Sequence, residues 1–159
     1  MKKTVIAAIL CLFVALAFGQ LLEKTIYVPD SLGGLLAPQC LAYDSASNTV
    51  FAGGGAGDCV VAIDAGSNWR VARIPAGRNI QAICYSPGDS ALYCANYASG
   101  NVTVIDAWSR SAVATVDAGD APVALCCNRT DNKIYCANYG SASVTVIAVS
   151  YTHLTLPTN

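Results

Sequence analysis

An ungapped repeat of 42 residues is the feature that most constrains how this chain can fold. Shifting the sequence by 42 positions places residues 80–105 over residues 122–147 with 13 identities in 26 positions. Residues 38–79 form a more diverged copy that precedes these two. A fixed period of about 40 to 45 residues is typical of proteins that stack one supersecondary unit repeatedly. The sequence therefore predicts a stacked architecture with units 38–79, 80–121 and 122–147, the last of them truncated.

Turn residues divide each unit into short apolar runs that are rich in Val, Ile, Tyr and Thr. Pro, Gly, Asn, Asp and Ser separate these runs, and none is long enough for a typical helix, so they predict strands. The predicted strands are 24–28, 38–43, 49–53, 59–64, 69–74, 80–85, 91–95, 101–106, 111–116, 122–127, 133–137 and 143–147. Four strands per unit is the pattern of a propeller blade. We therefore predict an all-β fold, a β-propeller fragment of about three four-stranded blades.

The second unit also carries a resemblance to a known family. Its segments 93–96 (Tyr-Cys-Ala-Asn), 102–106 (Val-Thr-Val-Ile-Asp) and 114–119 (Ala-Thr-Val-Asp-Ala-Gly) follow one another in order. This succession resembles the YVTN family of β-propeller repeats, and the resemblance covers residues 24–147. The sequence departs from the family where Cys-Ala replaces Val-Thr. The resemblance implies that an outer strand at 24–28 completes the last blade of a closed ring.

The beginning of the chain predicts export. Lys2 and Lys3 form a basic start, an apolar run follows to residue 18, and small residues come at its end. This succession is typical of a secretory signal peptide, which we place at residues 1–19. The alternative is a transmembrane anchor, but the apolar run is shorter than the ~20 residues that a spanning helix needs. We therefore expect an exported protein, periplasmic, cell-surface or secreted, with no stable membrane span after cleavage.

The end of the chain breaks the repeat. Asp64 and Asp106 predict Asp at position 148, where Ala148 stands. Residues 149–158 resemble the in-frame translation of a transposase-type sequencing adapter. We therefore expect residues 148–159 to be a non-native tail and the repeats to occupy 24–147. These residues cover about three periods, whereas propellers close with about 4–8 blades, so we expect the natural protein to continue with further blades.

The composition excludes several classes of function. His153 is the only histidine, and it lies in the foreign tail, so no Ser-His-Asp, Cys-His or His-metal site is predicted for the repeats. The 9 basic and 10 acidic residues are too evenly balanced for nucleic-acid binding. We predict no catalytic residue, no metal site and no cofactor in this part of the chain.

The cysteines that follow the signal peptide leave three interpretations open. Cys84 and Cys126 recur at the period of 42, as do Cys94 and Cys136, which favours small apolar residues packed in the strands. Export also permits disulfides, and a cysteine cluster can bind metal, although no Cys-x-x-C spacing occurs. The cysteines concerned are Cys40, Cys59, Cys84, Cys94, Cys126, Cys127 and Cys136. Asp64 and Asp106, which follow strands at equal positions, are expected to fix turns by hydrogen bonds to the backbone.

Binding is predicted at one rim of the blades. Loops between second and third strands and loops between consecutive units share this rim. We predict that it carries the ligand-binding residues Arg78, Asn79, Asn96, Tyr97, Asp120, Asn138 and Tyr139. The alternative is that the repeated Asn-Tyr pair only shapes the turn, with Asn in a left-handed backbone and Tyr packed between blades.

Two classes of function remain. The first is an exported, non-enzymatic recognition or interaction scaffold whose partner is an unidentified protein or extracellular ligand. The alternative is a propeller enzyme, a lactonase-like hydrolase or a haem- or quinone-linked oxidoreductase, whose catalytic residues lie in the missing blades. Fold alone does not separate them.

Overall fold

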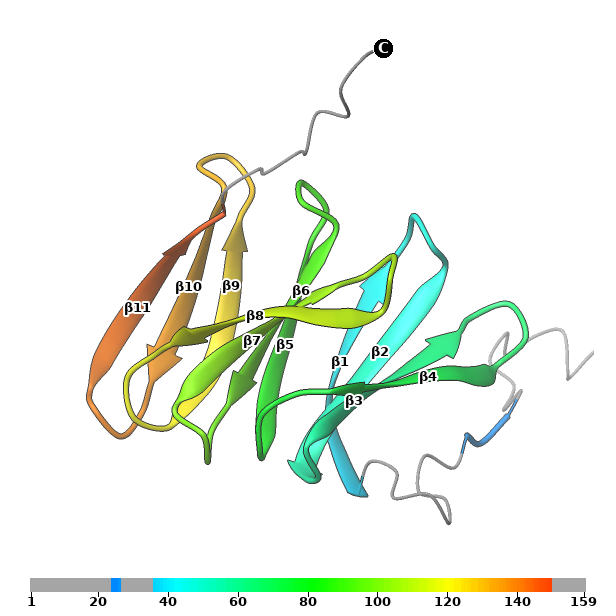
Figure 1. Cartoon of the computed structure of the whole chain (residues 1–159), viewed down its shortest axis with the longest axis horizontal. Coiled ribbons are helices and arrows are strands. Elements are labelled where there is room, and N and C mark those ends of the chain that lie inside the picture. Colours follow the sequence, from blue (N-terminus) through cyan, green and yellow to red (C-terminus); the bar gives the residue numbers. More distant parts are fainter. Residues whose placement is uncertain (1–23, 27–35, 150–159) are drawn as a thin grey trace, which may run out of the picture.

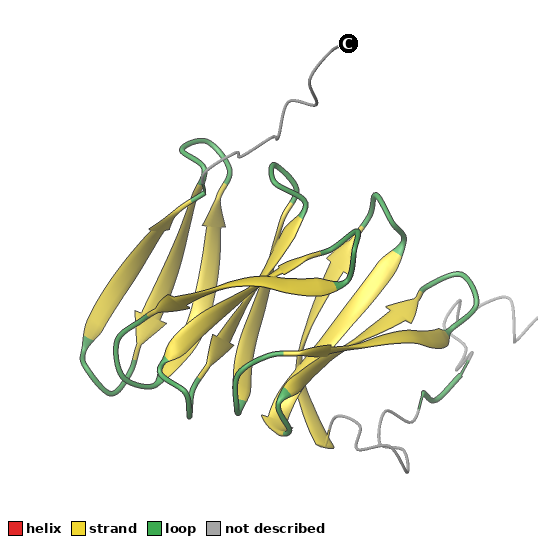
Figure 2. Ribbon diagram, in the orientation of Figure 1, coloured by secondary structure: helices red, strands yellow, loops and turns green. Residues whose placement is uncertain are grey.

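The computed structural model describes residues 24–26 and 36–149, and every regular element among them is a β-strand (Figure 2). These strands form three antiparallel sheets that lie side by side, and we call them blades 1, 2 and 3 (Figure 1). Blade 1 consists of β1 (Leu36–Asp44), β2 (Thr49–Ala56), β3 (Cys59–Asp64) and β4 (Trp69–Pro75). Blade 2 consists of β5 (Ile80–Ser86), β6 (Ala91–Asn96), β7 (Asn101–Asp106) and β8 (Ser111–Asp117). Blade 3 consists of β9 (Pro122–Asn128), β10 (Lys133–Asn138) and β11 (Ser143–Ala148).

The predicted all-β architecture is confirmed, and the repeat is visible in the strands. β2, β6 and β10 begin 42 residues apart, and so do β3, β7 and β11. Within each blade every strand pairs antiparallel with the next strand along the chain. The strands follow the predicted runs to within three residues at either end. Among residues 24–26 and 36–149 there is no helix long and apolar enough to cross a membrane.

The predicted strand at 24–28 is wrong for the residues that the structure describes. Residues 24–26 belong to no strand, and residues 27 and 28 lie outside the described residues. A strand needs a partner for its backbone groups, whereas this segment contacts blade 1 through side chains. The ammonium of Lys24 lies 4.6 Å from the ring centroid of Trp69, and Ile26 packs against apolar side chains of blade 1.

The tight turns repeat with the same period as the strands. Asn48, Ser90 and Asn132 end the first hairpin turn of blades 1, 2 and 3, with φ angles of 49°, 53° and 51°. Asn68 and Arg110 hold the corresponding place in the third hairpin, with φ angles of 58° and 55°. A left-handed backbone is uncommon outside glycine, and asparagine tolerates it best among the other residues. Each blade therefore reverses its chain at equivalent positions.

Aspartates hold the turns between third and fourth strands, as predicted. The Oδ1 atom of Asp64 accepts a hydrogen bond from the backbone N–H of Ser67 at 2.7 Å. Asp106 accepts the equivalent bond from Ser109 at 2.6 Å. The bonds from the hydroxyl and backbone N–H of Ser67 lower the pKa of Asp64 below its usual value. The repeated acids are therefore turn-forming residues.

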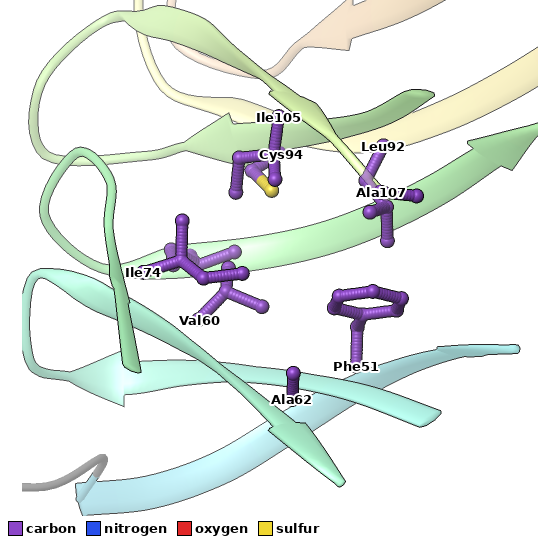
Figure 3. Packing of buried hydrophobic residues seen from close by; sticks show 9 residues of the cluster. Phe51, Val60, Ala62, Ile74, Leu92, Cys94, Ile105 and Ala107 are labelled. Carbon is purple, nitrogen blue, oxygen red and sulfur yellow. The ribbon is translucent and has the colours of Figure 1, made fainter. Parts of the chain in front are cut away.

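The joint between blades 1 and 2 is an apolar layer built from facing side chains. Phe51, Val60 and Ile74 of blade 1 face Leu92 and Ile105 of blade 2, and all five side chains are fully buried (Figure 3). Burying a side chain of this size stabilises the fold by about 1.5–3 kcal/mol. The first strands of neighbouring blades, β1 and β5, pack against each other as well. This layer attaches blade 1 to blade 2.

The joint between blades 2 and 3 uses the opposite face of blade 2. Tyr93, Ala95 and Val102 of blade 2 pack with Ile134 and Cys136 of blade 3. Successive residues of a strand point to opposite faces, so β6 sends one set of side chains to each neighbour. All six residues of β6 are buried. This two-sided burial explains why the central strands read as continuous apolar runs.

The predicted signal peptide and most of the predicted tail lie outside the described residues. Ala148 and Val149 continue the backbone pattern of the repeat, because Ala148 pairs with Lys133 and the N–H of Val149 donates to the carbonyl of Asn132 at 2.9 Å. The equivalent bond in blade 2 joins Ala107 and Ser90 at 2.9 Å. The origin of residues 149–158 stays a prediction.

Candidate functional site

The predicted rim begins at the joint between blades 1 and 2. The N–H of Tyr97, in the β6–β7 loop, donates to the carbonyl of Asn79 in the β4–β5 crossover at 2.9 Å. The N–H of Ala98 donates to the carbonyl of Arg78 at 3.2 Å, and the N–H of Arg78 donates to Ser99 Oγ at 2.9 Å. The two loops therefore form one hydrogen-bonded surface, and the crossover cannot move independently of blade 2.

The joint between blades 2 and 3 repeats this arrangement. The N–H of Tyr139 donates to the carbonyl of Ala121, and that of Gly140 donates to the carbonyl of Asp120, both at 2.9 Å. The N–H of Asp120 donates to Ser141 Oγ at 3.0 Å. Backbone hydrogen bonds therefore hold the crossovers and loops together in the same way at both joints. The exposed side chains of these segments can differ from one joint to the other.

Asn96 lies inside this rim. Its side chain is fully buried, and its Nδ2 donates to Asn101 Oδ1 and to Thr103 Oγ1, both at 2.8 Å. Gly77 of the preceding crossover approaches so closely that a Cβ there would lie 2.4 Å from Asn96 Cγ. A side chain in the crossover would therefore displace the amide. Asn96 therefore holds the β6–β7 turn through its side-chain hydrogen bonds, and the crossover packs closely against its amide.

Asn138 holds the same place in blade 3. It is 2% exposed, and its Nδ2 donates to Ser143 Oγ at 3.1 Å and to Thr145 Oγ1 at 2.9 Å. Gly119 lies beside it, although a Cβ at Gly119 would meet Ser141 Oγ before it met Asn138 Nδ2. Neither asparagine is among the described residues with a positive φ, so the expected left-handed backbone is wrong. The buried amide shapes the turn through side-chain hydrogen bonds instead.

The other predicted binding residues lie at or near the surface. Arg78 and Asp120 are exposed, and Asn79 is half-buried with its Oδ1 accepting a hydrogen bond from Gln81 Nε2 at 2.6 Å. Tyr97 is 38% exposed, and Tyr139 is 78% exposed. Tyr139 is therefore not packed between blades, because no further blade lies against blade 3 in the described part of the chain.

A hollow of about 670 Å³ opens on the rim at the joint between blades 1 and 2. Arg73 and Asp58 form an ion pair within it, with 2.8 Å between Nη2 and Oδ1, and both side chains are substantially exposed. The lining residues are Gly55, Gly57, Asp58, Arg73, Arg78, Asn79 and Ala98. The hollow brings together two of the predicted binding residues, Arg78 and Asn79.

Comparisons with known proteins bear on the fold. No protein-family model matches the sequence, and no curated protein sequence matches it. Solved structures do match. Hydrazine synthase from Kuenenia stuttgartiensis superposes with a TM-score of 0.67 and 20% identity, over 82% of this chain and 36% of that chain. A chain of the mitotic checkpoint complex gives a TM-score of 0.63 and 15% identity, over 70% of this chain and 36% of that chain.

A third match is a 6-phosphogluconolactonase-like protein from Bacteroides fragilis, with a TM-score of 0.62 and 14% identity, over 71% of this chain and 35% of that chain. The matched structures are propellers. This chain has a β-propeller fold. It spans about a third of the length of each of these structures. At such identities the likeness establishes the architecture, and it transfers no activity.

The described cysteines of the propeller differ in burial: three are buried, three are half-buried and one is exposed. Cys59, Cys94 and Cys136 are buried in the apolar layers, where the predicted packing role is confirmed. Cys126 is exposed, although it shares its repeat position with the half-buried Cys84. The difference arises because blade 3 lies beside Cys84, whereas no described blade follows blade 3. Each described cysteine is a free thiol, and within residues 24–26 and 36–149 no three potential metal ligands gather.

Burial controls the acidity of the half-buried thiols. Loss of solvent raises the pKa of Cys40 to about 11 and that of Cys84 to about 11. Burial also raises the pKa of Tyr85 to about 12, and its hydrogen bond with Asp44 of blade 1 acts in the same direction. These groups are therefore neutral near pH 7, and none is a ready nucleophile.

Sequence reasoning missed part of the rim. Gly55, Asp58 and Arg73 line the hollow together with Arg78, yet none of these three was predicted to bind a ligand. The prediction named the repeated Asn-Tyr pair and residues of the crossovers, and it left out the β2–β3 loop and the fourth strand of blade 1. The missed residues are positions at which blade 1 departs from blade 2, where Tyr97, Gly100 and Thr115 stand 42 positions later. These departures from the repeat were the sequence signal that could have indicated the missed residues.

Proposed function

We propose that this protein is an exported, non-enzymatic propeller of the YVTN type that recognises a partner through its rim. One observation carries the proposal. The loops and crossovers of the rim are joined by backbone hydrogen bonds that are the same in both joints, while the exposed crossover residue is Arg78 at one joint and Asp120 at the other. A rigid base with variable side chains is the arrangement that binding loops have on other scaffolds.

The side chains of the rim suit reversible recognition. Tyr97 and Tyr139 offer a rigid apolar face with a hydroxyl, and Arg78 and Asp120 offer opposite charges. Because a tyrosine side chain has only two main torsions, it loses little conformational entropy on binding. The partner is a protein or another extracellular ligand. The repeat resemblance, with its Tyr-x-x-Asn strands, supports the assignment to the YVTN type.

The proposal is tested by measuring binding of the full chain to arrays of peptides and glycans. Each partner found is then measured against Tyr97→Ala, Tyr139→Ala and the control Arg129→Ala, which lies in the β9–β10 turn on the opposite rim. We expect the two tyrosine variants to weaken binding at least tenfold with a nearly unchanged melting temperature, and the control to bind normally.

Two results would overturn the proposal. In the first, the tyrosine variants lower the melting temperature and leave the affinity unchanged. In the second, the full chain hydrolyses a sugar-acid lactone, the kind of substrate that the lactonase-like structural neighbour's name implies. Turnover that is lost on substitution of rim residues would favour the enzymatic alternative.

A further inference from the structure

The two joints of the propeller differ most at one point of the rim. Tyr97 and Tyr139 occupy the same position in blades 2 and 3, and the residue 42 positions before Tyr97 is Gly55. The hollow described above lies beside Gly55. A tyrosine in the other blades is thus replaced in blade 1 by a residue without a side chain, which opens space between blades 1 and 2.

The charges around this space differ as well. Arg73 stands where blade 2 has Thr115, and Arg78 stands where the second crossover has Asp120. Two positions that are neutral or acidic at the second joint are therefore basic at the first. Side chains that serve the blade architecture are expected to repeat, as Asn96 and Asn138 do, so these changes are not required by the fold.

The groove, as we call this hollow, carries one net positive charge. The carboxylate of Asp58 pairs with Arg73 at 2.8 Å. No described acid forms an ion pair with Arg78, which is exposed at the edge of the groove. The arginine guanidinium binds a carboxylate through two parallel hydrogen bonds. Arg78 is therefore positioned to receive an anionic group from outside the protein.

The walls of the groove are fixed by backbone hydrogen bonds between the β4–β5 crossover and the β2–β3 loop of blade 1. The N–H of Ala76 donates to the carbonyl of Asp58 at 2.8 Å, and the N–H of Asn79 donates to the carbonyl of Gly57 at 3.4 Å. The crossover that carries Arg78 is therefore held to the β2–β3 loop on one side and to the β6–β7 loop on the other. A preformed groove loses little free energy to ordering when a ligand binds.

We propose that this groove binds a carboxylate-bearing ligand, with Arg78 as its anchor. The planar guanidinium of Arg78 matches the two oxygens of a carboxylate, and the net positive charge of the groove favours an anion over a neutral group. The inference deepens the proposed recognition function, because it names the ligand chemistry for one part of the rim. The carboxylate belongs either to a glutamate or aspartate side chain of a peptide or to a small free acid.

The experiment titrates the isotopically labelled full chain with three probes and follows its amide signals by NMR. The probes are the capped peptide Gly-Gly-Glu-Gly-Gly, the same peptide with Gln in place of Glu, and glutarate. We expect one or both carboxylate probes to shift the signals of residues 55–58, 78, 79 and 98 saturably, and the Gln peptide to leave them unchanged. The tighter of the two carboxylate probes identifies the source of the carboxylate.

Two variants test the groove itself. Arg78→Asp introduces the residue of the second joint and should weaken binding at least tenfold. Gly55→Tyr restores the tyrosine of blades 2 and 3 and should fill the groove. The backbone of Gly55 needs no positive φ, and the nearest atom to an added Cβ is the flexible end of Gln39 at 2.9 Å, so the fold should tolerate the change. Arg129→Asp, in the β9–β10 turn on the opposite rim, is the matched charge-reversal control and should bind as the parent does.

The proposal is overturned if neither carboxylate probe shifts these signals, or if Arg78→Asp binds as tightly as the parent chain. Failure of the groove is distinguishable from failure of rim recognition. A partner whose binding depends on Tyr97 and Tyr139 but not on Arg78 contradicts the groove alone. The opposite result is also possible. If the Glu peptide binds in a way that depends on Arg78, while the partners found on the arrays bind Tyr97→Ala and Tyr139→Ala as tightly as the parent, only the recognition role of the two tyrosines is contradicted.

Discussion

The same five residues, Tyr-Cys-Ala-Asn-Tyr, occur in blade 2 and in blade 3 and meet different surroundings. In β6, Tyr93 is 4% exposed and Ala95 is fully buried. In β10, the equivalent Tyr135 and Ala137 are only half-buried, although Ile134 beside them is fully buried. Blade 2 has a blade on each side, whereas among the described residues blade 3 contacts only blade 2.

The third strands show the same contrast. Val102 of β7 is fully buried, whereas Val144 at the same position in β11 is 61% exposed. Identical side chains on equivalent strands thus contribute differently to stability, because burial of the second face depends on a neighbouring blade. The local sequence makes both faces of a blade apolar. Whether the second face is buried depends on the presence of a neighbouring blade.

The largest expected effect concerns this pair of valines. Val102→Asp would place an unpaired carboxylate in the joint between blades 2 and 3 and should cost about 4 kcal/mol or more of unfolding free energy. Val144→Asp should change it by less than about 0.5 kcal/mol, because the side chain is exposed. Urea denaturation of both variants gives the comparison. Equal destabilisation would show that β11 is covered in solution.

The two crossover glycines offer a second comparison. A methyl group at Gly77 would lie 2.4 Å from Cγ of Asn96, which is fully buried and cannot move away. Gly77→Ala should therefore cost about 1–3 kcal/mol. At Gly119 the nearest atom is the hydroxyl of the exposed Ser141, which can rotate at the cost of its hydrogen bond from Asp120, and Asn138 Nδ2 lies farther away at 2.8 Å, so Gly119→Ala should cost less. Chemical denaturation measures both, and a larger cost at Gly119 would contradict the role given to Asn96.

A third test uses pH and the half-buried thiol of Cys84. Burial raises the pKa of Cys84 to about 11 from the usual thiol value of 9.0. A thiol with a raised pKa in the folded state favours folding below pH 9, and this contribution is lost as the pH rises from 9 to 11. The melting temperature should fall across this window. Cys84→Ala should reduce the fall, and an unchanged fall in this variant would contradict the prediction.

The smallest expected effect concerns the turn before the third strand. Gly100 of blade 2 and Ala142 of blade 3 both have a positive φ, 65° and 48°. Ala142→Gly should relieve backbone strain and raise the unfolding free energy by about 0.5–1 kcal/mol, and Gly100→Ala should lower it by a similar amount. Thermal melts of the two variants test this pair, and shifts in the same direction would contradict the proposed strain.

Particular elements show how far sequence reasoning reached. The strands β1 to β11 followed from alternating apolar runs and turn residues, since both signals are local. The segment 24–28 was misassigned in its described part because a strand also needs a partner edge, which a run of apolar residues does not reveal. The side chain of Asn96 was expected at a binding rim, but it is buried. The residue that packs against it, Gly77, lies 19 positions earlier in the preceding crossover, and the local sequence does not reveal this contact.

The sequence by itself determined the all-β architecture, the order of the strands and the apolar character of both blade faces, because a period of 42 and its turn chemistry act within each unit. Only the tertiary structure decided which faces are buried, where the rim hydrogen bonds run, and that Gly55, Arg73 and Arg78 surround one groove. The physical reason is that these features arise where two units meet. Contacts between residues of different units depend on how the blades pack, which no single unit encodes.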